Sequence, residues 1–156
     1  MNRFLKFRKI FGKLQSKNLE KMSNERDKQT AFEVVKTTPY LQHLGIELVE
    51  IEHGKAVMKL PMRDELRQPY GLLHGGATAS LIDTATAFAV VSVTTREEKC
   101  TTVDLTVHYL RPVIDETTIC TATIVRAGRR LITVSAEVHN ENGKLIATAL
   151  STYAKV

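Results

Sequence analysis

Residues 68–83 read QPYGLLHGGATASLID, and this stretch decides the fold. From His74 onward, small and apolar residues predict one long helix over about residues 74–94, opened by the glycine pair Gly75–Gly76. Neither glycine has a Cβ, so a ligand can approach the backbone closely. The free N–H groups and the positive dipole end of such a helix favour negative charge there. Asp83 follows Gly75 by eight residues, just over two turns, and lies among apolar neighbours where an unpaired charge is costly.

The segments around this helix predict strands and one more helix. A short helix is expected over Ala31–Leu41, broken near Pro39. Alternating or β-branched runs bounded by turn residues predict six strands: Gly45–Val49, Lys55–Leu60, Thr101–Leu110, Thr117–Val125, Leu131–His139 and Leu145–Tyr153. A long antiparallel sheet curled around one central helix satisfies this order, and the small side chains of residues 74–94 indicate a closely enclosed helix. The fold class is therefore α+β, and pairing with a second copy is the expected cover for the edge strands.

The basic character of the chain belongs to its N-terminus. Residues 1–21 carry seven Lys or Arg against Glu20, a net charge of +6. Since the whole chain is +5, the other 135 residues carry −1, which gives the domain no basis for nucleic-acid binding. We expect a basic amphipathic extension and linker over residues 1–30 and one domain over residues 31–156.

Three interpretations of the extension remain open, because Phe4, Phe7, Phe11 and Leu14 lie on one stripe of a helix. It could make a weak contact with a membrane surface, pack as an extra helix, or be absent if translation starts at Met22.

No run approaches the roughly 18 apolar residues of a membrane span. The two cysteines, Cys100 and Cys120, show no metal-type spacing and are expected to be reduced, buried thiols of a cytoplasmic protein. The histidines likewise show no metal-ligand spacing, so no metal site is expected.

Several motifs resemble those of one known family. They are Leu73–Gly76, Leu81–Asp83, Val103–Leu105 and Tyr109–Pro112. They are similar to the hotdog-fold acyl-CoA thioesterases of the phenylacetate-degradation type, in the 4-hydroxybenzoyl-CoA thioesterase-like superfamily, over roughly residues 40–155. The resemblance implies hydrolysis of acyl-CoA to a free acid and CoA without a metal or other cofactor. It also implies a dimer or dimer of dimers whose active sites lie at the subunit interface.

The resemblance also implies roles for individual residues. Asp83 would be the general base or the nucleophile, and the backbone N–H of Gly75 would polarise the thioester carbonyl. His74 would support this oxyanion site, Gln68 would orient the water or the thioester, and Thr102 would reach Asp83 from the other subunit. The CoA or substrate contacts would come from Gly76, Arg111, Arg129 and Arg130. Some relatives hold the water with a hydroxyl one turn after the carboxylate, where this chain has Ala87.

Two other functions remain open at this stage. A hotdog dehydratase or hydratase would act on acyl thioesters with a catalytic histidine, which the Gly-Gly pair after His74 fits less well. A non-catalytic acyl-CoA binding or sensing module would retain affinity without releasing CoA. The combination of Asp83, Gln68 and Gly75 argues for the hydrolase.

Overall fold

The computed structural model describes residues 27–95 and 97–156. The predictions for the basic extension at residues 1–21 and for a start at Met22 lie outside these residues. The chain divides into two compact units at Val34/Val35, and the unit Val35–Val156 contains the whole sheet and all of the candidate site residues.

The elements follow the predicted order. Residues 27–37 are helical, Thr38 is extended, and Pro39 begins the short helix α2. A residue before proline avoids the helical region, whereas proline itself fits the first helical position, which explains why the break falls at Thr38. The remaining elements are β1 (Glu47–Glu52), β2 (Lys55–Leu60), the 3₁₀ turn η1 (Asp64–Leu66), α3 (Gly75–Val91), β3 (Cys100–Tyr109), β4 (Thr118–Ala127), β5 (Leu131–Asn140) and β6 (Leu145–Lys155).

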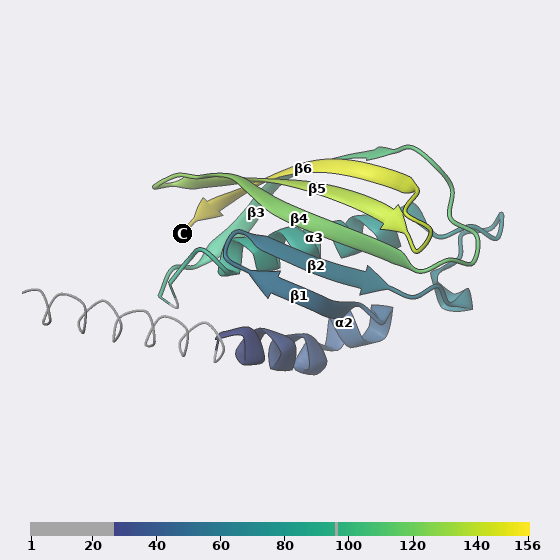
Figure 1. Cartoon of the computed structure of the whole chain (residues 1–156), viewed down its shortest axis with the longest axis horizontal. Coiled ribbons are helices and arrows are strands. Elements are labelled where there is room, and N and C mark those ends of the chain that lie inside the picture. The colour runs from purple at the N-terminus through teal and green to yellow at the C-terminus, as the bar shows by residue number, and fades with distance from the viewer. Residues whose placement is uncertain (1–26, 96) are drawn as a thin grey trace, which may run out of the picture. The chain divides into compact units, whose positions relative to one another are not determined.

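The six strands form one antiparallel sheet in the order β1-β2-β4-β5-β6-β3. Helix α3 lies along one face of this sheet, as Figure 1 shows. It contacts every strand. The predicted hotdog architecture is therefore confirmed, and the strand boundaries differ from the predicted ones by at most three residues. The largest difference is at β1, which begins at Glu47 because Gly45 is the left-handed cap of α2.

The core lies between α3 and the sheet. On the helix side, Leu81, Ile82, Ala85 and Ala89 have no exposed surface. The sheet opposes them with fully buried side chains that alternate along the strands: Ala56, Met58, Cys120, Ala122, Ile132, Val134 and Val138. The two alanines let the helix approach the sheet closely, so the position of α3 is fixed by packing.

One side of α3 differs from the prediction of an enclosed helix. Ala79, Asp83 and Ala87 are only partly buried, and Val91 is 61% exposed. The sheet covers only one side of the helix, because a helix presents side chains in all directions around its axis. The small, apolar character continues on the uncovered side.

Strand β3 forms one edge of the sheet and pairs only with β6. It is ten residues long, and none of its side chains is fully buried. A β-bulge between Thr102 and Asp104 allows both Thr102 and Leu105 to face α3, since their cross-strand partners Tyr153 and Ser151 are buried on that side. A long edge strand of this kind offers a row of unpaired backbone groups.

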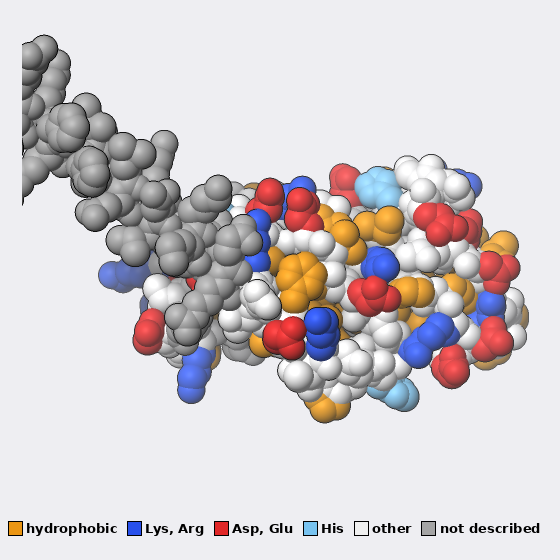
Figure 2. All heavy atoms as spheres, turned by 60° about the horizontal axis from the view of Figure 1, so that its bottom comes forward, with side chains coloured by type: hydrophobic (Ala, Val, Ile, Leu, Met, Phe, Trp, Pro, Cys, Tyr) orange, Lys and Arg blue, Asp and Glu red, His pale blue; other side chains and the backbone are white. Residues whose placement is uncertain are grey.

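Figure 2 shows acidic and basic side chains interspersed with apolar ones on the face that it presents. No helix in residues 27–95 and 97–156 is long and apolar enough to cross a membrane.

The two cysteines provide a test of the core. Cys120 is fully buried in β4, and burial raises the pKa of its thiol from an ordinary value of 9.0 to about 12. The neutral thiol is thus favoured by folding, and this contribution to stability is lost as the pH rises above about 9. Burial also raises the pKa of the partly exposed Cys100.

We expect a thiol reagent at pH 8 to react slowly with Cys100 and not with Cys120 until denaturant is added. Counting reacted thiols by absorbance before and after unfolding measures this. Two rapidly reacting thiols in the folded protein would contradict the packing of β4 against α3.

Candidate functional site

The Asp83 carboxylate is surrounded by hydroxyl groups. Thr102, on β3, donates from Oγ1 to Asp83 Oδ1 over 3.0 Å. The hydroxyl of Tyr153, on β6, lies 3.3 Å from the same oxygen and 3.0 Å from the Asp83 carbonyl oxygen. Thr86 Oγ1 lies 2.9 Å from that carbonyl oxygen and 2.8 Å from the Tyr153 hydroxyl. The hydroxyls of Thr102 and Tyr153 therefore hold the carboxylate, which would be costly to bury without partners, while Thr86 contacts the Asp83 carbonyl and the Tyr153 hydroxyl.

The other carboxylate oxygen of Asp83, Oδ2, accepts no hydrogen bond from any group in the described part of the chain. Because Asp83 is only partly buried, this oxygen is the part of the carboxylate that remains for water or a ligand.

At the N-terminus of α3, the backbone N–H groups of Gly75 and Gly76 differ in their hydrogen bonding. His74 is the N-cap, and its Nδ1 accepts a hydrogen bond from Gly76 N–H over 2.8 Å. An accepting Nδ1 places the proton of the neutral imidazole on Nε2. A Cβ on Gly76 would lie 3.0 Å from that Nδ1, so a side chain at position 76 would push the His74 ring out of its capping position.

Gly75 N–H is the amide that remains available. Among residues 27–95 and 97–156 it has no acceptor, and it stands at the first position of α3. The Tyr109 hydroxyl, at the end of β3, donates to the Gly75 carbonyl over 2.9 Å. An open N–H at the positive end of a helix dipole is suited to stabilising an oxyanion.

The loop before α3 is held in place by Arg67. Its guanidinium donates to Asp64 over 2.9 Å, to the Gly71 carbonyl over 2.6 Å, to the Ile114 carbonyl over 2.8 Å and to Asp115 over 2.6 Å. These bonds join residues 64–71 to the segment that follows β3. The arrangement fixes the backbone next to Gln68.

Gln68 forms the turn of this loop. Its Oε1 accepts from Tyr70 N–H over 2.7 Å, and its carbonyl accepts from Gly71 N–H over 2.9 Å. The amide nitrogen of Gln68 remains as a donor, and no contact between Gln68 and Asp83 is found within the described residues.

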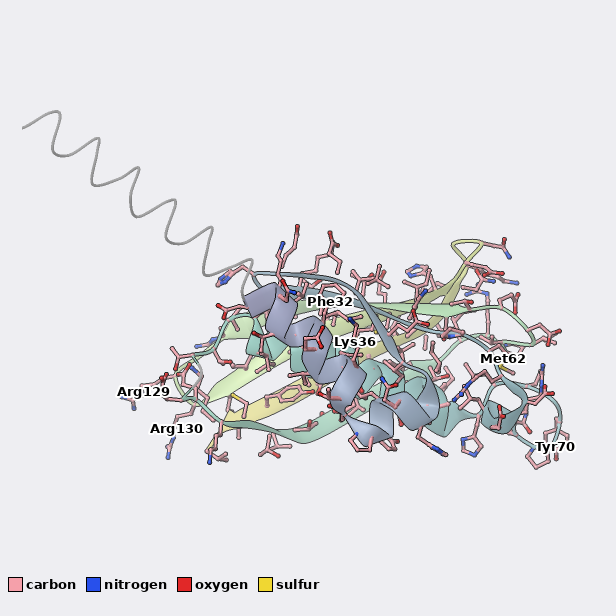
Figure 3. The ribbon with its side chains drawn as sticks, turned by 90° about the horizontal axis from the view of Figure 1, so that it is seen from below. Phe32, Lys36, Met62, Tyr70, Arg129 and Arg130 are labelled. Atoms are coloured by element: carbon pink, nitrogen blue, oxygen red, sulfur yellow. The ribbon has the colours of Figure 1, made fainter. Side chains whose placement is uncertain are left out.

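The arginines predicted to contact CoA lie at two different ends of the unit. Arg111 lies two residues after Tyr109 and donates to the Leu145 carbonyl over 2.7 Å, so it shares an end with the start of α3. The backbone carbonyl of Arg130 accepts from the N–H of Lys155, whose cross-strand partner Cys100 begins β3, about 30 Å along that strand from Tyr109. Figure 3 shows Arg129 and Arg130 at the opposite end of the unit from Tyr70.

Within residues 27–95 and 97–156, no three His, Cys, Asp or Glu side chains come together as a metal site would require. The expectation that no cofactor takes part stays a prediction.

Comparison with known proteins decides the family. The model of the thioesterase superfamily matches residues 70–147, which include α3, Asp83 and Thr102. The chain belongs to the thioesterase superfamily. It is 33% identical over 130 residues to the medium/long-chain acyl-CoA thioesterase YigI of Escherichia coli, with 74% of this chain and 84% of that protein covered.

Solved structures agree with this membership of the thioesterase superfamily. The conserved protein PA5202 of Pseudomonas aeruginosa matches with a TM-score of 0.73 and 34% identity, over 76% of this chain and 94% of that one. A variant of the phenylacetic acid degradation protein PaaI of Thermus thermophilus matches with a TM-score of 0.71 and 28% identity, over 76% of this chain and 100% of that one. The resemblance noted in the sequence is thus confirmed, and the predicted class of thioester hydrolase is that of the family.

The geometry corrects one expectation for this thioesterase. Thr102 was expected to reach Asp83 from another subunit, but the structure shows the bond within one chain. The reason is that β3 pairs with β6 in the sheet that packs on α3. The Thr102 side chain therefore points toward the helix of its own protomer.

The sequence did not reveal the two other hydroxyls at Asp83. Tyr153 lies 70 residues away from Asp83, and Thr86 resembles any other small residue of α3. The alternation of β6 was a usable signal for Tyr153, since it places this residue on the face toward α3.

Proposed function

We propose that this thioesterase hydrolyses acyl-CoA to a carboxylic acid and CoA, with Gly75 N–H and Asp83 as the reacting groups. The observation that carries the proposal is the open N–H of Gly75 at the start of α3, on the same helix as the partly buried Asp83 carboxylate, which is held at Oδ1. The similarity to a protein named as a medium/long-chain acyl-CoA thioesterase supports acyl-CoA as the substrate class.

In the proposed reaction, Asp83 Oδ2 takes a proton from a water, whose oxygen attacks the thioester carbonyl. The carbonyl oxygen becomes an oxyanion that accepts from Gly75 N–H. The tetrahedral intermediate then expels the CoA thiolate, which takes up the proton, and the free acid remains. His74 Nε2–H is a second donor at this end of α3, and Gln68 orients the water or the thioester. The reaction needs no metal or other cofactor.

The spacing along α3 indicates that two copies build each site. Eight residues of helix rise separate Gly75 from Asp83 by about 12 Å. Two groups that both contact one carbonyl, or its attacking water, lie within about 6 Å of each other. A Gly75 N–H of one copy can therefore act with the Asp83 of another, whereas the pair within one copy is too far apart.

Two surfaces are suited to such a pairing. The exposed edge of β3 can pair with β3 of a second copy, and the uncovered side of α3 can be buried at the same time. An antiparallel β3 pair would bring the Arg129–Arg130 end of one copy to the Arg111 end of the other, beside the CoA phosphates. A homodimer, or a dimer of dimers, is the assembly that we propose.

Two substitutions of Gly75 distinguish the loss of its backbone N–H from the effect of adding a side chain at this position. Proline at the first helical position removes only an N–H that makes no helix bond, and the extended His74 backbone (φ −63°, ψ 133°) suits a following proline. We expect Gly75→Pro to lower kcat for CoA release by about 10²- to 10³-fold. The matched control, Gly75→Ala, keeps the N–H, and its Cβ would meet Tyr109 at an ordinary 3.5 Å.

Equal kcat values for Gly75→Pro and Gly75→Ala would contradict the proposed role of Gly75 N–H in stabilising the oxyanion. CoA release is followed with a thiol reagent on a panel of short, medium, long and aryl acyl-CoAs.

Substitution of Asp83 tests the base. We expect Asp83→Asn to lower kcat by about 10²- to 10⁴-fold, because the amide cannot take a proton from water. Asp104→Asn, on the exposed side of β3, is the control and should stay near wild type. Binding of acyl-CoA by the wild type without any CoA release would instead favour the non-catalytic binding module.

We favour Asp83 as general base over Asp83 as nucleophile. A single turnover in oxygen-18 water separates the two roles. Label in the enzyme carboxylate after turnover would exclude the base-only route.

A further inference from the structure

We infer that Tyr153 is a positioning residue that, with Thr102, holds Asp83 Oδ1 and so leaves Oδ2 as the reacting oxygen. This inference rests on the proposed catalytic role of Asp83. It assigns a role to a buried side chain that the reaction scheme does not otherwise use.

The first support is the register of the strands. Thr102 and Tyr153 are direct cross-strand partners on β3 and β6, on the face toward α3. Their hydroxyls converge on the same carboxylate oxygen, at 3.0 and 3.3 Å. The bulge that follows Thr102 keeps this pair aligned although the next residues shift in register.

The second support is the count of hydrogens. Tyr153 and Thr86 each have one hydroxyl hydrogen, and Asp83 offers its carbonyl oxygen and Oδ1 as acceptors. The Tyr153 hydroxyl has three acceptors within reach: Thr86 Oγ1 at 2.8 Å, the Asp83 carbonyl oxygen at 3.0 Å and Asp83 Oδ1 at 3.3 Å. Thr86 can serve the carbonyl over 2.9 Å, and the charged carboxylate oxygen is the strongest of the three acceptors, which favours Oδ1 for the Tyr153 hydrogen.

The third support is burial. Tyr153 is 3% exposed, so its hydroxyl has no access to bulk water as an alternative partner. Burial, with the nearby Asp83 carboxylate acting in the same direction, raises the pKa of Tyr153, and the group therefore remains a neutral donor. A phenol held between strands in this way restricts rotation of the carboxylate, and geometry of this kind is needed for a catalytic base.

The test compares Tyr153→Phe with Ser151→Ala. Phenylalanine keeps the ring and removes only the hydroxyl. Ser151 lies on the same strand, is equally buried, and donates to the Asp104 carbonyl instead of to Asp83. We expect Tyr153→Phe to lower kcat about tenfold with KM within about twofold of wild type, and Ser151→Ala to leave both constants near wild type.

A second pair of variants covers a failure of Tyr153→Phe to fold. Thr102→Val should lower kcat, and Thr102→Ser, which restores a hydroxyl, should recover it. If folded Tyr153→Phe retains kcat within about twofold, or if Thr102→Ser is no better than Thr102→Val, the inference is wrong.

Asp83→Asn separates this inference from the proposed function. In the Asp83→Asn background, Tyr153→Phe should cause no further loss of the residual rate, whereas a merely structural hydroxyl would cause the same loss in both backgrounds. An Asp83→Asn variant with wild-type activity would overturn the proposed function itself.

Discussion

The burial of α3 against the sheet is the constraint on which the rest of the structure depends. Ala85 and Ala89 have no exposed surface, so the helix lies close to the strands and cannot shift without opening the core. Its N-terminus is thereby fixed beside Tyr109, and its middle is fixed beside β3 and β6. Gly75 N–H and Asp83, to which we assign the chemistry, owe their positions to this one packing contact.

The same contact explains why a carboxylate is tolerated at position 83. The sheet that buries one side of α3 also brings the hydroxyls of Thr102 and Tyr153 to the boundary between the buried and open sides. Asp83 is therefore satisfied on one oxygen by the fold and left free on the other. A residue fully inside the core would need both oxygens paired and would have none left for chemistry.

Much of this could be predicted from the sequence, because it is local. The helix, the strands and the Gly75 position follow from periodicity and from the glycine pair, and the partnership of Asp83 with Thr102 was implied by the family motif. Tyr153 could not be predicted, since its contact depends on a cross-strand register between segments far apart in the chain. The location of Arg129 and Arg130 at the far end from Arg111 also required the sheet order. The extension at residues 1–21 lies outside the described residues and stays with its three interpretations.

The central claim is that each site combines Gly75 of one copy with Asp83 of another. Subunit mixing tests it most directly: Gly75→Pro and Asp83→Asn proteins are co-refolded or co-expressed, and CoA release is measured. Each variant alone should be inactive, but half of the mixed dimers are hybrids in which one of two sites is intact, so activity should recover to about a quarter of wild type. No recovery from a verified hybrid would contradict the claim, because a site contained in one copy cannot be restored by mixing.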